Sequence, residues 1–553
     1  MSLTARPIGC YVAELLAANG IDTVFGIPGV HTLELYRGLA REPRLRHILT
    51  RHEQGAGFAA DGYARASERP AAAFVISGPG VTNILTSVAQ AYSDSVPMLV
   101  VASTPVRASL GRRWGVLHEL SDQQGVMGNV LDLACTAASA EEIRDHLQAV
   151  FQEFHTGRPR PAYLGIPLDL LAEPTTLVAE RFQLAESPGH AVAAGIEPAA
   201  ALLSAAQRPL IIAGGGARAA AGELRQLIEA LDGYLVTTAA GKGVLPEAHR
   251  CNLGCSLPFA DTQRLLAEAD VVLAVGTEMA ETDIYTALKL TIPGRLIRID
   301  IAAERNEQYP AAVRIRGDAR AAVAALRGRV TDRAGWCSLS GGAAPHRARI
   351  DATLDAAAVI RRQVLAAIRA ALPADGAVFS DMTQIAYLGN YAYAADVPGA
   401  WHHPSGYGTL GYALPAALGA KLAMPDRAVV ALAGDFGVQF TIADLTTAVE
   451  LGLSLPLVVW NNAALGQIRD DMTATDIPPI GVVARNPDFV ALAQACGAQG
   501  LRVRRSAELT LAIVQALQRR GPTLIEVHEA EFTPGRSAQA VPSHHLTLPG
   551  NEP

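Results

Sequence analysis

The sequence of 553 residues predicts an α/β protein that folds into three doubly wound parallel-sheet domains. Short apolar runs alternate with segments of helical periodicity, and single helices between successive strands imply parallel pairing. This alternation occurs in three stretches of the chain and lapses around residues 180–194 and 330–349, which are expected to be linkers. We therefore expect domains over residues 1–182, 190–330 and 352–540, followed by a loose tail.

The first domain has four clear strand patterns and three clear helix patterns. The expected strands are Thr23–Phe25, His47–Thr50, Ala73–Ser77 and Met98–Ala102. The amphipathic segments between them are Thr32–Arg41, Gln54–Ala66 and Val81–Ser93. Their order is that of a doubly wound sheet.

The same alternation returns in the middle and near the end of the chain. In the middle, one strand is expected at the start of Pro209–Ala217, which then enters a glycine-rich turn. Two more strands are expected at Val271–Gly276 and Arg295–Ile301. In the third domain they are Ala377–Asp381, Ala428–Asp435, Leu455–Asn462 and Thr523–Val527.

Composition excludes several classes of protein. Half of the residues are hydrophobic, 18% are charged and the net charge is -7, which argues against a nucleic-acid binder with a basic face. No apolar run is long enough to span a membrane, and the N-terminus lacks a secretory pattern. The six cysteines are scattered, and Cys251 and Cys255 near His249 lack partners at zinc-ligand spacing. We expect a cytoplasmic protein that binds neither nucleic acid nor membrane.

The strongest chemical signal lies between two expected strands of the third domain. One strand ends in Gly434-Asp435-Phe436-Gly437, a helical segment follows at Ile442–Leu451, and the next strand ends in Asn461-Asn462. Parallel strands bring their carboxyl ends to one edge, where α/β sheets bind ligands. Carboxylate and amide oxygens suit Mg²⁺ or Ca²⁺, while glycine backbone and a helix start suit a diphosphate. The pattern predicts a metal-diphosphate clamp; a plain turn and strand end is the alternative.

This unit resembles the signature of thiamine diphosphate enzymes, Gly-Asp-Gly followed by Asn-Asn. The resemblance implies thiamine diphosphate and Mg²⁺ as cofactors, with the metal held by Asp435, Asn462 and the main-chain carbonyl of Ala464. It places the rest of the diphosphate site at Gly434, Phe436, Gly437, Leu465 and Gly466. Phe436 departs from the family, which has glycine there, and the turn is expected to close because Gly437 follows.

The segment Arg51-His52-Glu53-Gln54 follows an expected strand and begins a glycine- and alanine-rich helix. It resembles the Arg-His-Glu segment of the acetolactate synthase-like branch, which places there the glutamate that activates the cofactor. A carboxyl group hydrogen-bonded to N1′ of the aminopyrimidine stabilises the imino tautomer, whose 4′-nitrogen takes the thiazolium C2 proton. The alternative is that Glu53 only stabilises the helix start through the helix dipole.

Two Gly-Pro turns of the first domain resemble those that border the catalytic cavity in this family. They are Phe25–Gly29 and Ser77–Asn83, and Gly78 of the second turn is expected to touch the cofactor. His31 follows the first turn, and His118 lies in a later loop. Both are candidate proton shuttles, and surface histidines are the alternative.

The segment Gly406–Lys421 resembles the part of the family that shapes the cofactor. The resemblance implies that the carbonyl of Gly408 accepts from the 4′-amino group and that Leu410 wedges the two rings into a bent conformation. The domains are then pyrimidine-binding, central Rossmann-like and diphosphate-binding in chain order. Because Glu53 and the clamp lie on different domains, the family builds each site between two subunits, and we expect a homodimer or homotetramer.

The middle domain contains a glycine-rich loop, Ala213–Leu224, and an acidic strand end at Asp300. Acetolactate synthases bind FAD in this domain, whereas other members of the family keep the fold without a flavin. We expect an empty structural domain, with FAD as the alternative.

The leading functional hypothesis is non-oxidative decarboxylation of a 2-oxo acid through a C2 carbanion and an enamine. Segments along nearly the whole chain are most similar to 5-guanidino-2-oxopentanoate (2-ketoarginine) decarboxylases, and Glu119, Asp470 and Asp471 are available for a guanidinium group. One alternative is a carboligase that joins the enamine to a second 2-oxo acid or aldehyde, as acetolactate synthase does. Another is a non-catalytic paralogue.

Overall fold

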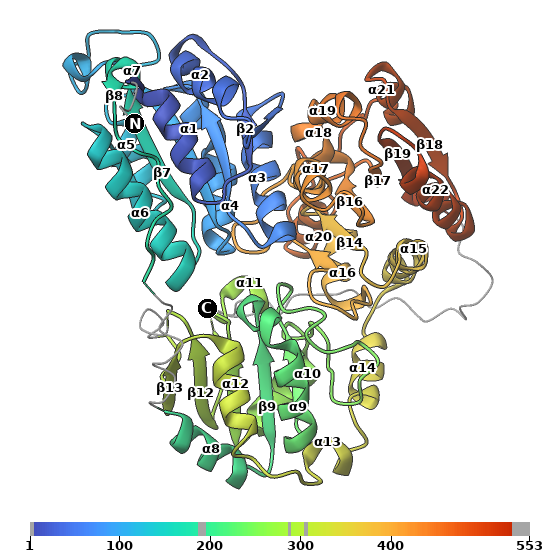
Figure 1. Ribbon diagram of the computed structural model, residues 1–553. Coiled ribbons are helices and arrows are strands. Elements are labelled where there is room, and N and C mark those ends of the chain that lie inside the picture. Colours follow the sequence, from blue (N-terminus) through green and yellow to red (C-terminus); the bar gives the residue numbers. More distant parts are fainter. Residues whose placement is uncertain (1–4, 186–194, 286–288, 303–307, 533–553) are drawn as a thin grey trace.

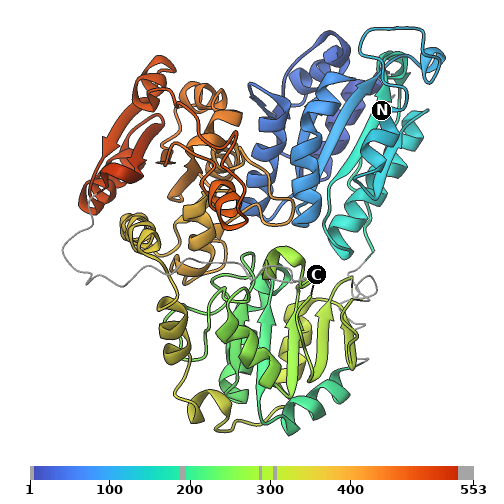
Figure 2. The same ribbon diagram turned by 180° about the vertical axis from the view of Figure 1, so that it is seen from behind.

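The computed structural model describes residues 5–185, 195–285, 289–302 and 308–532, and it confirms three α/β domains with parallel sheets. The N-terminal and C-terminal domains lie side by side, and the middle domain lies below both in the view of Figure 1. Figure 2 shows the same arrangement from behind. Among the described residues, no helix combines the length and apolar character needed to cross a bilayer. The tail and residues 186–194 of the first expected linker lie outside the described residues.

The N-terminal domain is built on a six-stranded sheet of order β3-β2-β4-β5-β7-β6, with every pair parallel. Its strands are β2 (Thr23–Gly26), β3 (Arg46–Leu49), β4 (Ala71–Val75), β5 (Met98–Thr104), β6 (Leu133–Thr136) and β7 (Ala162–Pro167). Its helices are α1 (Ile8–Ala18), α2 (Leu33–Arg41), α3 (Glu53–Ser67), α4 (Pro79–Ser93), α5 (Gln123–Gly128), α6 (Ala140–Thr156) and α7 (Leu168–Ala172). A short antiparallel pair, β1 (Arg6–Pro7) with β8 (Pro174–Thr175), joins its two ends.

The C-terminal domain repeats this plan with the order β15-β14-β16-β17-β19-β18. Its strands are β14 (Ala377–Ser380), β15 (Trp401–His402), β16 (Val429–Gly434), β17 (Pro456–Asn461), β18 (Gln499–Val503) and β19 (Thr523–His528). Its helices are α15 (Ala356–Ala371), α16 (Gln384–Ala392), α17 (Ala413–Ala423), α18 (Asp435–Thr441), α19 (Asp444–Glu450), α20 (Gly466–Ala474), α21 (Phe489–Ala495) and α22 (Ser506–Gln518).

The middle domain has a five-stranded parallel sheet of order β10-β9-β11-β12-β13. Its strands are β9 (Pro209–Ala213), β10 (Tyr234–Thr237), β11 (Val271–Val275), β12 (Arg295–Asp300) and β13 (Val313–Arg316). Its helices are α8 (Ile196–Ala205), α9 (Ala221–Leu231), α10 (Ala260–Glu268), α11 (Glu281–Ile284) and α12 (Ala319–Arg327).

Helices α3 and α17 join the N-terminal and C-terminal domains of one chain. Their small residues let the two backbones approach closely, because a Cβ added at Gly62 would lie 1.9 Å from the carbonyl oxygen of Ala416. A Cβ at Gly419 would lie equally close, 1.9 Å, to the carbonyl oxygen of Ala59. One buried apolar cluster contains residues of both helices and both sheets. The two domains therefore share a core.

The structure corrects one sequence-based expectation and adds one helix. The expected linker at 330–349 contains α13 (Trp336–Leu339) and α14 (Ala344–Asp351), which pack on the middle domain. Nδ1 of His346 lies 2.7 Å from Oδ2 of Asp261 in α10, a tertiary contact that carries no local pattern. The helix expected at Ile442–Leu451 is confirmed as α19, and a further helix that was not expected, α18, precedes it and begins directly at Asp435.

Candidate active site

Both outer domains place candidate residues where the strand order reverses. In the N-terminal sheet this point lies between β2 and β4, and the turns after these strands carry His31 and Gly78. In the C-terminal sheet it lies between β14 and β16, and β16 leads into Asp435. Crevices at such switch points are where open α/β sheets bind ligands. The fold thus supplies two half-sites, one on each outer domain.

The residues of the predicted clamp lie at the carboxyl ends of β16 and β17. The register pairs Gly434 with Trp460, so that Asp435 and Asn461 follow at the same level of the sheet. Asp435 is buried at 2% exposure, and burial raises the pKa of its carboxyl group. Its carboxylate accepts from amides, and no Lys or Arg pairs with it among the described residues. A buried carboxylate without a counter-charge is suited to a bound cation.

Two asparagines that the sequence analysis did not assign hold the clamp in place. The side chain of Asn486 donates to Oδ2 of Asp435 at 2.6 Å and to Oδ1 of Asn461 at 3.0 Å. Asn461 in turn donates to the buried Glu526 at 2.7 Å. The first residue of the Asn-Asn pair therefore faces into the domain, which leaves Asn462 at the edge. Asn486 lies in a loop far along the chain, and its position in the sequence gave no signal.

The backbone between Asn462 and Gly466 is tightly shaped. Ala463 has a φ of 53°, in the left-handed region that non-glycine residues rarely adopt. The main-chain N–H of Leu465 donates to the carbonyl of Val482 at 2.8 Å. A Cβ at Gly466 would lie 2.3 Å from the side-chain oxygen of Gln384, so a larger residue there would require that side chain to shift. The buried Ala464 is fixed within this turn.

The departure at Phe436 does not disturb the clamp. Phe436 lies inside α18 in ordinary helical geometry, and its N–H donates to Oδ1 of Asp435 at 3.1 Å. The requirement for glycine falls one residue later, because a Cβ at Gly437 would lie 2.8 Å from Oδ2 of Asp381.

The segment from Gly406 to Tyr412 is held by residues of the N-terminal domain. Asp94 accepts from the N–H of Gly406 at 2.8 Å, and Gln90 accepts from Thr409 at 3.0 Å through its hydroxyl group. Within its own domain the buried Asp381 accepts from the N–H of Gly411, and burial raises the pKa of this acid to about 6.

The result is an exposed Gly408 with a φ of 71° and a half-buried Leu410 beside it. These two residues therefore lie on a fixed turn at the surface of the chain.

Glu53 is the first residue of α3 and is half-buried. Its Oε2 accepts from the side-chain amide of Asn83 at 2.9 Å, and Asn83 belongs to the second Gly-Pro turn. Two of the three segments that sequence similarity singled out in this domain are thus in direct contact. Asn83 was part of a predicted motif, but its partner became known only from the structure.

The two candidate histidines lie together. Nδ1 of His31 is 2.7 Å from the hydroxyl oxygen of Ser77, and the rings of His31 and His118 are 5.0 Å apart. Burial and the nearby His118 lower the pKa of His31. His118 has a φ of 63°, and its Nδ1 is buried without a hydrogen-bond partner among the described residues. A Cβ at Gly78 would lie 2.5 Å from the carbonyl oxygen of His118, so the glycine lets this loop close on the turn.

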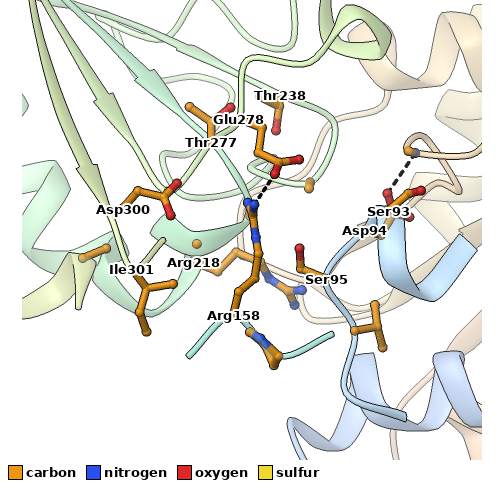
Figure 3. Close-up of a pocket in the computed structure, with 18 of the residues that line it drawn as sticks. Ser93, Asp94, Ser95, Arg158, Arg218, Thr238, Thr277, Glu278, Asp300 and Ile301 are labelled. Atoms are coloured by element: carbon orange, nitrogen blue, oxygen red, sulfur yellow. Dashed lines mark hydrogen bonds and ion pairs between the residues drawn. The ribbon is translucent and has the colours of Figure 1, made fainter. Parts of the chain in front are cut away.

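A separate cavity of about 420 Å³ lies at the junction of the domains (Figure 3). The glycine-rich loop and Asp300 of the middle domain both line it, as the sequence suggested for a dinucleotide site. Arg158 of the N-terminal domain forms an ion pair with Glu278 across it. Glu53, Asp435 and Asn462 are not part of its lining.

The lining of this cavity does not fit the diphosphate of a flavin. The N–H groups of Gly214 and Gly216 donate to main-chain carbonyls of Val275 and Gly276, at 2.9 and 3.0 Å, rather than facing a ligand. The lining has six carboxylates and three guanidinium groups, and burial raises the pKa of Asp283 to about 7. Because acidic groups outnumber basic groups in this lining, it is a poor match for an anionic diphosphate.

The candidate clamp, by contrast, fits a Mg²⁺ diphosphate. Carboxylate, amide and main-chain carbonyl oxygens are the hard donors that Mg²⁺ takes, and they are available at Asp435, Asn462 and Ala464. Gly466 carries no side chain of its own, so nothing projects from this position to keep a ligand away from the backbone.

Comparisons with known proteins identify the family. Models of the N-terminal thiamine pyrophosphate (TPP) binding domain, the central domain and the C-terminal TPP binding domain of thiamine pyrophosphate enzymes match residues 7–126, 196–326 and 381–527.

Curated relatives cover nearly the whole chain. A probable 2-ketoarginine decarboxylase, AruI, of Pseudomonas aeruginosa is 48% identical over 94% of each chain. The acetolactate synthase large subunit of Parasynechococcus marenigrum is 31% identical over 96% of this chain and 90% of its own. The acetolactate synthase isozyme 1 large subunit of Escherichia coli is 29% identical over 94% and 93%. The chain belongs to the thiamine pyrophosphate enzymes, the decarboxylases and carboligases whose cofactors are thiamine diphosphate and Mg²⁺.

Proposed function

We propose that this enzyme catalyses the non-oxidative decarboxylation of 5-guanidino-2-oxopentanoate. The observation that carries the proposal is the similarity, along nearly the full length of both chains, to a relative named as a probable 2-ketoarginine decarboxylase. The acetolactate synthases are markedly less similar. When bound, thiamine diphosphate supplies the nucleophile for the 2-oxo carbon and the electron sink for loss of CO₂.

We assign the anchoring of the cofactor to the clamp. Asp435, Asn462 and the carbonyl of Ala464 would hold Mg²⁺, and the backbone from Gly434 to Gly437 and from Leu465 to Gly466 would bind the diphosphate. The absence of a basic partner near Asp435 among the described residues supports this assignment, because the metal then balances the buried charge. The turn with Gly408 and Leu410 shapes the rest of the cofactor.

We assign the activation of the cofactor to Glu53. Its carboxyl group shares a proton with the aminopyrimidine, and the amide of Asn83 orients one of its oxygens at 2.9 Å. Replacing Glu53 with Gln removes this proton while it preserves size. Activity unchanged in Glu53→Gln would refute the assignment, whereas a parent protein without activity on any 2-oxo acid would support the non-catalytic alternative.

The histidine pair is proposed to move the proton that completes the product. His31, whose pKa is lowered, is neutral at physiological pH, so it can exchange a proton with a bound group. Its bond with Ser77 fixes the ring, and the adjacent His118 leaves one nitrogen free of protein partners among the described residues. Replacement of either histidine with Phe should lower kcat more than it changes KM.

Asp471 is proposed to accept the guanidinium group of the substrate. The carboxylate of Glu119 accepts from the N–H groups of its own loop, and Asp470 pairs with Arg469 and Gln384. The half-buried Asp471 accepts only from the amide of Gln467 among the side chains that the structure describes. Of the three candidate acids, Asp471 therefore has the fewest described hydrogen-bond and ion-pair partners within the protein.

The test of this assignment compares Asp471→Asn with the control Asp470→Asn. Because a hydrogen bond to a charged group contributes about 1.5–3 kcal/mol, Asp471→Asn should raise KM for the guanidino acid about 10- to 100-fold. KM for an uncharged 2-oxo acid should not change. An equal change for both substrates, or a larger effect in the control, would exclude Asp471 as the partner.

Each active site is proposed to form between two chains. Apolar side chains remain exposed beside both half-sites of a single chain: Val30, Leu33 and Leu117 near His31, and Phe440, Ile468 and Ile480 near the clamp. Such surfaces are covered in oligomers. Mixing inactive Glu53→Gln and Asp435→Ala proteins should restore activity, because a mixed dimer has one intact site. No recovery after subunit exchange would place both residues in one chain's site.

Product analysis separates decarboxylase from carboligase. The enzyme with thiamine diphosphate and Mg²⁺ is incubated with single and paired 2-oxo acids, and CO₂, aldehyde and coupled products are measured. We expect equal amounts of CO₂ and 4-guanidinobutanal from the guanidino acid. Coupled products as the main outcome would favour the acetolactate synthase-like reaction. We further propose that the middle domain carries no flavin, and absorbance of the purified enzyme near 450 nm would contradict this.

A further inference from the structure

Helix α19 contacts the strand-to-helix turn that carries Glu53 in the same chain. The turn connects β3 with α3 in the N-terminal domain, whereas α19 belongs to the C-terminal domain. The N–H of Arg51 donates to Oδ1 of Asp444 at 3.0 Å. The hydroxyl group of Thr447 donates to the carbonyl of Leu49 at 3.3 Å. Contacts at both ends of the turn therefore come from one helix of another domain.

A third contact, at the rim, is an ion pair between Arg51 and Glu450 at 2.7 Å. The side chain of Glu450 is 58% exposed, so this pair contributes little by itself. The contacts of Asp444 and Thr447 are different, because both side chains are at 1% exposure. Buried hydrogen bonds fix geometry more firmly than exposed ion pairs do.

Asp444 is packed directly against the first turn of α3. A Cβ at Gly55 would lie 1.8 Å from Oδ2 of Asp444, so the helix start has no space to move toward it. Oδ2 has no hydrogen-bond partner among the described residues, although it is buried. Burial raises the pKa of Asp444 to about 6. Keeping an acid at this cost is unusual for a position that only fills space.

We propose that Asp444 is a positioning residue, which holds the turn at Arg51 so that the carboxyl group of Glu53 points toward the cofactor. The inference rests on the proposed role of Glu53. Arg51 and Glu53 are two residues apart, so a shift of the turn moves the first residue of α3 with it. Asp444 itself takes no part in the chemistry.

The test measures the exchange of the thiazolium C2 proton of bound thiamine diphosphate with deuterium, followed by NMR after acid quench. This rate reports activation by Glu53 independently of substrate and of turnover. Cofactor affinity is measured in parallel by calorimetry. The variants are Asp444→Ala, Asp444→Asn and Thr447→Val. The control is Thr446→Ala, a half-buried residue of the same helix whose hydroxyl donates to the carbonyl of Ala443 and not to the turn at Arg51.

We expect Asp444→Ala to slow the exchange about 10- to 100-fold, as displacement of a catalytic group by a fraction of an ångström does. Asp444→Asn retains an oxygen for the N–H of Arg51 and should stay near the parent rate. The exchange rate of Thr447→Val should lie between those of Asp444→Ala and Asp444→Asn. The exchange rate of Thr446→Ala should equal that of the parent enzyme. Cofactor affinity should be similar in all four.

Two results would overturn the inference. One is an exchange rate in Asp444→Ala equal to that of the parent enzyme. The other is a slow rate in Asp444→Asn together with weaker cofactor binding, which indicates general loss of structure. Glu53→Gln separates this inference from the proposed function. If both Asp444→Ala and Glu53→Gln exchange the C2 proton at the parent rate, the proposed role of Glu53 is refuted. If Glu53→Gln is slow and Asp444→Ala is not, only the proposed role of Asp444 is refuted.

Discussion

Replacing Gly419 with alanine should force α3 and α17 apart. The added Cβ would lie 1.9 Å from the carbonyl oxygen of Ala59 and 2.7 Å from its carbon. An ordinary contact needs about 3.4 Å, so the helices must separate locally by about 1.5 Å. The obstacle is backbone within a helix, and it cannot rotate away as a side chain would. Separation opens the core that the two outer domains share.

The magnitude follows from two opposing effects. Overpacking a well-packed contact costs about 1–3 kcal/mol, and a rigid backbone obstacle places this case near the upper value. Alanine favours a helix over glycine by about 1 kcal/mol, which offsets part of the cost. The net loss is about 2 kcal/mol, or a fall of roughly 4–8 °C in the Tm of the outer domains.

Differential scanning calorimetry of the holoenzyme measures this shift. Gly222→Ala in α9 is the control, because a Cβ there meets nothing within 4 Å and should leave stability unchanged or slightly higher. Gly62→Ala should reproduce the loss from the opposite helix, where the carbonyl of Ala416 is the obstacle. A Gly419→Ala enzyme as stable as the parent would refute the reasoning, because the close approach of α3 and α17 would then not contribute to the free energy of unfolding.

Three further predictions concern pH and metal. Burial raises the pKa of Asp444 to about 6, so the stability supplied by its protonated form is complete below about pH 4 and is lost as pH rises through 6. Asp444→Asn should therefore match the parent at pH 4 and be more stable at pH 7 by up to about 3 kcal/mol, measured by thermal unfolding. The pKa of Asp261 behaves in the opposite way: burial acts to raise it, but hydrogen bonds from Arg349 and His346 lower it to about 2. Asp261→Asn should cost about 1–2 kcal/mol above pH 4, and the difference should vanish as pH falls through 2. Removal of Mg²⁺ with EDTA should release thiamine diphosphate, and added Mg²⁺ should restore binding measured by calorimetry in the parent but not in Asp435→Ala.

Local patterns in the sequence were sufficient for the architecture and for much of the candidate site. Alternation of apolar strands and amphipathic helices predicted the three parallel sheets, and the residues after β16 and β17 were expected at one edge because parallel strands end together. The short helices α13 and α14 were missed because their stability comes from packing on the middle domain and not from their own periodicity.

The residues that hold the site residues in position could not be predicted from local sequence patterns. Asn486 contacts Asp435 across 51 positions of sequence, and Asp444 contacts Arg51 across 393. These are single polar contacts between distant loops and helix ends, and no spacing rule connects their partners. The sequence also left open whether the middle domain binds a flavin. In a glycine-rich loop of this kind the main-chain N–H groups can face a ligand, or they can donate to neighbouring carbonyls, as Gly214 and Gly216 do here.

The contacts that hold the Gly406–Tyr412 segment have a consequence for substrate entry. Gln90 and Asp94 belong to the N-terminal domain, and the hydroxyl of Tyr412 donates to Asp61 of the same domain at 2.6 Å. Arg65 bridges Asp61 and Asp94 below them. A hinge between the outer domains would break all of these buried bonds at once. Opening of the site within one chain is therefore left to surface loops, because the two outer domains are expected to move as one rigid unit.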